Sequence, residues 1–81
     1  MTTAERKHVT AIKSLDCVVC GEPGPSDAHE PEQGLWFASV AVCLACHRGP
    51  KGWHGTRERW TLHKMDMFKA INKTIERVLF L

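Results

Sequence analysis

The chain has 81 residues, 11 basic and 9 acidic side chains, a net charge of +2, and 43% hydrophobic residues. This length allows one domain with a small core, for which a bound metal is a common additional source of stability. The composition excludes extensive disorder, and the chain has neither the apolar run of a membrane span nor the apolar core of a secretion signal near its start. We therefore expect one cytoplasmic domain, residues 1–81, with no membrane partner.

The N-terminal segment predicts a short amphipathic helix over residues 3–15, with Thr3 as a candidate N-cap. Its small or apolar side chains recur at helical spacing: Ala4, Val9, Ala11, Ile12 and Leu15. From Gly21 to Gly34, three prolines and three glycines interrupt regular structure. This stretch is expected to be a loop with one short strand near residues 27–30.

The second half of the chain predicts a strand, a loop and a helix. The apolar run Leu35–Val42 is rich in β-branched and aromatic residues, which favours a buried strand that completes a hairpin. Residues 48–55 are expected to be a loop, because glycine and proline disrupt a helix there. A C-terminal helix is predicted over residues 56–79, with Thr56 as N-cap and apolar residues every three or four positions. The fold class is therefore α+β.

The four cysteines form two pairs of identical spacing, separated by 22 residues: Cys17, Cys20, Cys43 and Cys46. Two thiolates three residues apart can bind one Zn²⁺ from a tight turn, and two such turns complete a tetrahedral site. Disulfides are the alternative, but a reducing cytoplasm favours the metal. Because four thiolates leave no open coordination position, this zinc would be structural, and folding would depend on it.

Three of the five histidines lie close to the cysteine pairs along the chain: His29, His47 and His54. Since the cysteines fill the zinc site, these imidazoles are free for another function. In a continuous helix His47 and His54 would lie about 10 Å apart along the axis, too far to share a metal. The glycines and proline between them remove this restriction.

Positive charge is concentrated after the last cysteine. From Arg48 to the end there are eight basic and three acidic residues. Such a surplus can contact a phosphate backbone, although an ordinary solvated helix face is the alternative beyond Lys64. Aromatic rings among the basic residues can stack on bases. The candidate nucleic-acid-binding residues are Arg48, Lys51, Trp53, Arg57 and Arg59.

The order of these residues resembles that of HNH endonucleases of the ββα-metal, or His-Me finger, superfamily. It is most similar to small phage and prophage proteins in which a histidine in a loop precedes a Cys-x-x-Cys-His element. The matching elements are Cys17-x-x-Cys20, Ala28-His29, Val42-Cys43-Leu44-Ala45-Cys46-His47 and His54-Gly55. The resemblance implies a zinc-stapled ββα-metal core, with the zinc knuckles and the β-hairpin in residues 16–47 and a helix on either side.

The resemblance also implies a metal-dependent DNA endonuclease or nicking enzyme that hydrolyses phosphodiester bonds. His29 matches the histidine that acts as general base on the attacking water. His47 matches a ligand of a catalytic divalent metal such as Mg²⁺, Mn²⁺ or Ni²⁺. His54 is assigned as a second metal ligand or a phosphate contact.

Two positions depart from the pattern of the family. Ala28 stands where an aspartate often binds the metal, but Asp27 would face the same side of a strand as His29 and can supply the carboxylate. Glu30 is a second candidate. The central asparagine of the motif is absent, and Ser39 lies in its region.

These departures leave a second interpretation open, in which the chain is a catalytically inactive zinc-dependent module that binds nucleic acid or acts as an adaptor. A third is a protein-binding zinc module that forms a homodimer through its C-terminal helix, with Met65, Met67 and Phe68 on the dimer face. The expected partners are DNA and the recombination or packaging proteins of a phage. The expected location is the cytoplasm of a bacterial host.

Overall fold

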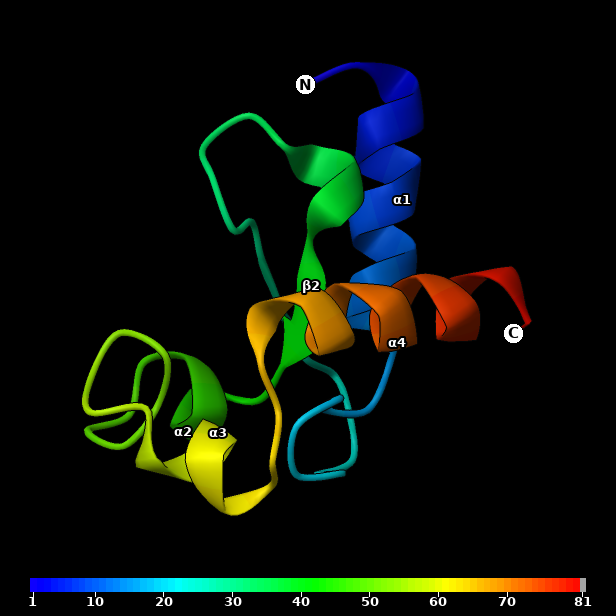
Figure 1. Cartoon of the computed structure of the whole chain (residues 1–81). Coiled ribbons are helices and arrows are strands. Elements are labelled where there is room, and N and C mark those ends of the chain that lie inside the picture. The colour runs from blue at the N-terminus through cyan, green and yellow to red at the C-terminus, as the bar shows by residue number, and fades with distance from the viewer. Residues whose placement is uncertain (81) are drawn as a thin grey trace.

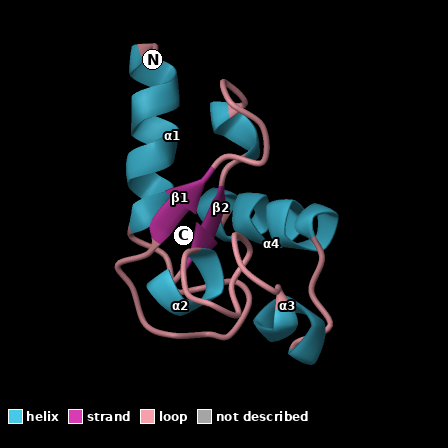
Figure 2. Ribbon diagram, turned by 90° about the vertical axis from the view of Figure 1, so that its left-hand side faces the viewer, coloured by secondary structure: helices cyan, strands magenta, loops and turns pink. Residues whose placement is uncertain are grey.

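The computed structural model describes residues 1–80, which form a two-stranded antiparallel sheet, four α-helices and one 3₁₀ helix (Figures 1 and 2). The elements in chain order are α1 (Thr3–Lys13), β1 (Asp27–His29), η1 (Trp36–Ala38), β2 (Val40–Val42), α2 (Leu44–His47), α3 (Glu58–Leu62) and α4 (Met67–Leu79). The predicted α+β class is confirmed. Over the described part of the chain, every helix is too short or too polar to cross a membrane.

Helix α1 begins at Thr3, as predicted, but it ends at Lys13, two residues before the predicted end of the range 3–15. Its N-cap is one residue earlier than expected. Thr2, and not Thr3, is the N-cap, because its side chain accepts a hydrogen bond from the Glu5 N–H at 3.1 Å. The Glu5 carboxylate in turn accepts the Thr2 N–H, which completes a capping box. The helix ends at Lys13 and buries Val9 and Ile12.

The hairpin is confirmed, but its second strand is shorter than predicted. Strand β1 pairs with β2 so that Asp27 lies opposite Val42 and His29 lies opposite Val40. Because β1 ends at His29, the residues before Val40 have no strand to pair with, and they form η1 instead. In the first half of the apolar run Leu35 and Phe37 are exposed, at 47% and 54%, whereas Trp36 and Ala38 are half-buried.

The predicted continuous helix over residues 56–79 is wrong, because the chain breaks it into α3 and α4. Thr56 is not the N-cap of α3. That position is held by Arg57, which adopts a left-handed φ of 64°. Asp66 caps α4 by accepting the Lys69 N–H at 2.8 Å, and this strong N-cap starts a new helix.

Helix α4 crosses the sheet over β2, and α1 lies beside the sheet (Figure 1). The Thr74 hydroxyl fixes this crossing, since it accepts the Ala41 N–H at 3.3 Å and donates to the Ala70 carbonyl at 2.8 Å. The largest buried apolar side chains of the core are Ile12, Val18, Val40, Val42 and Trp60. The core therefore holds the hairpin between α1 and α4 and leaves its other end to the cysteines and histidines.

Candidate metal centres

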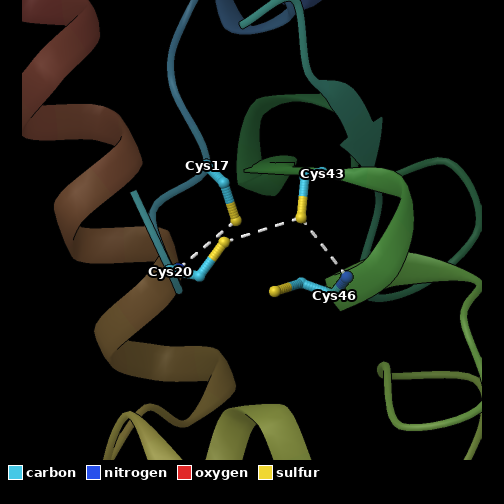
Figure 3. A group of neighbouring side chains, drawn as sticks. All are labelled: Cys17, Cys20, Cys43 and Cys46. Atoms are coloured by element: carbon cyan, nitrogen blue, oxygen red, sulfur yellow. Dashed lines mark hydrogen bonds between the residues drawn. The ribbon is translucent and has the colours of Figure 1, made fainter. Parts of the chain in front are cut away.

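The four cysteines converge into one group, in which the four Sγ atoms all lie within 4.8 Å of one another (Figure 3). All four are free, and the Sγ atoms of Cys20 and Cys43 are 3.6 Å apart. Sulfurs bound to one zinc at about 2.3 Å in a tetrahedron would be separated by about 3.8 Å. The cysteine cluster, Cys17, Cys20, Cys43 and Cys46, could therefore hold a zinc ion.

Each pair of cysteines occupies a tight turn that orients both thiols. The Cys20 N–H points to the Cys17 Sγ at 3.5 Å, and the Cys46 N–H points to the Cys43 Sγ at 3.4 Å. Cys43 is also the N-cap of α2, so the second turn continues directly into this helix. Backbone donors of this kind stabilise thiolates and hold them in position for a metal.

The pKa values of the thiols diverge in the metal-free cluster. Burial raises the pKa of Cys43 and of Cys46, although a hydrogen bond from Arg59 opposes the rise at Cys46. Burial also raises the pKa of Cys20, but hydrogen bonds with the Glu22 backbone and the neighbouring cysteines outweigh it and bring this pKa down to about 7. A cation in the cluster would stabilise all four thiolates together.

The three histidines selected from the sequence also converge and form the histidine cluster, His29, His47 and His54. Their ring centroids are 4.9 to 5.0 Å apart, and one nitrogen of each lies within 4.8 Å of the others. His29 Nδ1 lies 3.1 Å from His47 Nε2. Nitrogens bound to one tetrahedral metal at about 2.0 Å are separated by about 3.3 Å, so this donor set fits a divalent cation.

The hairpin and α2 place two of these histidines, and a tight loop places the third. His29 ends β1 and His47 ends α2. The loop returns to α2 because the Trp53 N–H donates to the Cys46 carbonyl at 2.8 Å and the His54 N–H donates to the His47 carbonyl at 3.1 Å. The break in helical structure predicted between His47 and His54 is therefore what brings them together.

Asp27 lies beside His47, on the ring edge that faces away from His29. Its Oδ2 is 2.9 Å from His47 Nδ1, and its side chain is 45% exposed. A carboxylate that accepts the Nδ1 proton leaves Nε2 unprotonated and free to bind a metal. Asp27 thus contacts the same imidazole as His29, consistent with strand alternation, but its carboxylate contacts the His47 ring and is not a member of the His29, His47 and His54 group, where it was expected as a metal ligand.

The two other polar candidates, Glu30 and Ser39, lie next to the strands of the hairpin and make no contact with the histidine cluster through a hydrogen bond. The Glu30 carboxylate accepts the Gly34 N–H at 2.8 Å and closes the loop after β1. Ser39 is 1% exposed, and its hydroxyl has no hydrogen-bond partner within residues 1–80. The serine side chain therefore does not bridge the strands as the missing asparagine would.

His29 is strongly shifted toward the neutral form. Burial, followed by the nearby His47, His54 and Arg57, lowers the pKa of His29 to about 4. Its Nε2 is buried and has no hydrogen-bond partner in the described part of the chain. The imidazole is therefore neutral at pH 7, with a lone pair available to a metal or a proton.

Solvent reaches the histidine cluster from one side. His29 and His47 are only 8% and 6% exposed, whereas His54 is exposed. Arg57 and Trp53 lie next to this open side, with the Arg57 guanidinium carbon 3.6 Å from the Trp53 ring centroid and the Trp53 ring 6.3 Å from that of His29. A ligand of the cluster would therefore meet His54, Arg57 and Trp53 first.

The other basic candidates differ in their surroundings. Arg48 is exposed at the end of α2, and Lys51 forms a surface ion pair with Glu58 at 3.7 Å. Arg59 donates its Nε–H to the Cys46 Sγ at 3.3 Å. This contact with the cysteine cluster was not predicted, because thirteen residues separate the two side chains and no local pattern links them.

Comparison of the chain with protein families, curated proteins and solved structures finds no match. The resemblance to HNH endonucleases therefore stays a prediction from the sequence. What the structure adds is a small α+β fold that brings a four-cysteine cluster and a three-histidine cluster to neighbouring positions.

Proposed function

We propose that the protein is a metal-dependent DNA endonuclease or nicking enzyme whose reaction takes place at the histidine cluster. The convergence of three imidazoles, one of them oriented by Asp27, carries this proposal. With His47 and His54 as ligands and His29 beside them, coordination positions would stay open, which is typical of catalytic and not of structural metal sites. A divalent ion held there would supply Lewis-acid stabilisation of the charge on the phosphate and on the leaving oxygen.

Each side chain of the cluster would have a separate role in the reaction. His47 and His54 would hold the ion, and Asp27 would fix the orientation of the His47 ring. His29 would accept the proton of the attacking water, because it is neutral at pH 7 and its Nδ1 lies 3.1 Å from the His47 nitrogen that would bind the ion. Arg57 would meet the phosphate at the open side of the cluster.

The test is cleavage of supercoiled plasmid by the zinc-loaded protein with added Mg²⁺, Mn²⁺ or Ni²⁺. Nicking that needs the added metal and is lost in His29→Ala is expected. His63→Ala is the matched control, because His63 is exposed at the end of α3 and lies outside the cluster. If His29→Ala also abolishes binding of Ni²⁺ in calorimetry, His29 is a third ligand and not the base.

One observation favours a second function, a zinc-dependent module that binds nucleic acid without cutting it. The low exposure of His29 and His47 restricts access to the cluster. This function predicts no nicking with any metal, together with a gel shift that weakens as salt is raised and that His29→Ala does not alter.

A further inference from the structure

Helix α4 carries large exposed apolar side chains beside the face that packs on the core. Ala70 and Thr74 are buried against the core, whereas Phe68 is 87% and Leu79 is 71% exposed. In Figure 1 the helix lies in front of β2, and no other element covers its outer side. Large apolar side chains exposed in a continuous row are typical of an interaction surface.

The exposed row has the spacing of a coiled-coil seam. Phe68, Asn72, Ile75 and Leu79 follow one another at intervals of four, three and four residues, as do the a and d positions of a heptad. The core of the chain uses other positions of the same helix, so the seam is free. Met67, which the sequence-based dimer face included, packs against the core and lies outside the seam.

The charges beside the seam identify the occupant. Lys69 and Glu76 each follow a d position by one residue, so both lie on the same side of the seam, and they have opposite sign. In an antiparallel pair of α4 helices, Phe68 meets Leu79 of the other copy. Lys69 then faces Glu76 of that copy, and the two-fold axis repeats the contact.

A parallel pair would not use these charges. It would bring Lys69 and Glu76 against the positions of Ile71 and Val78, which are uncharged. In the single chain Glu76 has no ion pair within residues 1–80, and Lys69 has only an exposed one to Asp66 at 4.0 Å. Exposed pairs of this kind contribute little stability, so Lys69 can change partner.

A groove runs along the same side of the helix. It has a volume of about 480 Å³, and it is lined by Met65, Phe68, Lys69, Asn72, Lys73 and Glu76. The first half of the seam, Phe68 and Asn72, therefore borders the same groove as Lys69 and Glu76.

We propose that this surface binds a second copy of the same chain, α4 against α4 in antiparallel orientation, with reciprocal Lys69–Glu76 pairs across the two-fold axis. The helix is already held by the core, so association does not have to pay for its folding. Each copy contributes only one short helix to the interface, so the buried area is small. The dimer is therefore expected to be weak and concentration-dependent.

Sedimentation velocity of the zinc-loaded full chain over a range of concentrations tests the proposal. A reversible monomer–dimer equilibrium is expected. Lys69→Glu and Glu76→Lys should each place like charges opposite one another twice and raise the dissociation constant about tenfold or more. The double variant Lys69→Glu/Glu76→Lys should restore the dimer, because it exchanges the signs and keeps both pairs.

The matched control is Arg6→Glu, which makes the same charge change at an exposed position of α1 and should leave the equilibrium unchanged. Circular dichroism of each variant establishes that α4 is folded. A chain that stays monomeric at every concentration overturns the proposal. So does a dimer that the single variants do not weaken, or one that the double variant does not restore.

Discussion

The indole Nε1–H of Trp60 donates to the carbonyl oxygen of Cys46 at 2.8 Å. Cys46 belongs to the cysteine cluster, and the next residue, His47, belongs to the histidine cluster. Trp60 is 2% exposed and packs against Trp53 with the ring centroids 4.8 Å apart and the ring planes tilted by 54°. One buried indole therefore braces the short helix that carries a side chain of each cluster.

Trp60→Phe removes this hydrogen bond and keeps most of the apolar ring. The free energy of unfolding should fall by about 1 to 2 kcal/mol, since the Cys46 carbonyl still accepts the Trp53 N–H. Trp60→Ala should lower it by about 3 to 5 kcal/mol, because it also leaves a cavity. Urea unfolding of the zinc-loaded proteins measures both free energies. If the two variants lost the same free energy of unfolding, the cavity would contribute nothing beyond the hydrogen bond, which would contradict the prediction.

Removal of zinc should unfold the protein. Chelation leaves four thiols in a cluster without the cation that holds them together, and it removes the link between the loop after α1 and α2. The expected result is loss of the far-ultraviolet helical signal, with one zinc released per chain. Re-addition of Zn²⁺ should restore the signal. A metal-free chain that keeps its native spectrum would exclude a structural role for this site.

Asp27→Asn should weaken metal binding at the histidine cluster by about 10- to 100-fold, because an amide can still accept the Nδ1 proton of His47 but no longer places a negative charge beside a ring that binds a cation. Titration with Ni²⁺, with zinc in the cysteine cluster, measures the affinity. Glu30→Gln is the matched control, since this side chain accepts the Gly34 N–H and an amide oxygen can still do so. Equal affinities in all three proteins would remove Asp27 from the site.

Thr74→Val should lower the free energy of unfolding by about 1 to 3 kcal/mol. It leaves the Ala41 N–H, which is buried in β2, without an acceptor. Thr74→Ser keeps the hydroxyl and should be much less destabilising. Thermal or urea unfolding of the zinc-loaded proteins separates the two. If Thr74→Ser were less stable than Thr74→Val, the packing of the methyl group would contribute more to the free energy of unfolding than the hydrogen bond.

Gly52→Ala should disturb the loop that carries His54. A Cβ atom at this position would lie 2.6 Å from the Ala45 carbonyl oxygen and 2.8 Å from the Cys46 carbonyl carbon, both of them backbone atoms that cannot move aside easily. We expect a less stable protein with lower Ni²⁺ affinity at the histidine cluster. An alanine variant with unchanged stability and affinity would show that the loop tolerates a different path.

The sequence predicts well where the determinants are local. The Cys-x-x-Cys spacing specifies a tight turn regardless of the rest of the chain, and the two turns meet as expected. The short strand that ends at His29 and the break between His47 and His54 follow from proline and glycine positions. The side of the strand that Asp27 shares with His29 follows from strand alternation.

The remaining features depend on contacts between distant segments. The length of β2 is limited by the three residues of β1, which the apolar run of the second strand does not reveal. The apolar period continues past Asp66 and hides the break before α4, although an aspartate before an apolar run is itself an N-cap signal. The contact of Arg59 with Cys46 arises only when α3 packs on α2.

Helix α2 has four residues, and its last two supply one side chain to each cluster, Cys46 to the first and His47 to the second. A helix this short cannot persist alone, so its position depends on the cysteine turn that begins at Cys43. The two clusters should therefore fill in a fixed order, zinc at the cysteines first and the second cation only afterwards. A chain without zinc would offer the second cation three unconnected imidazoles.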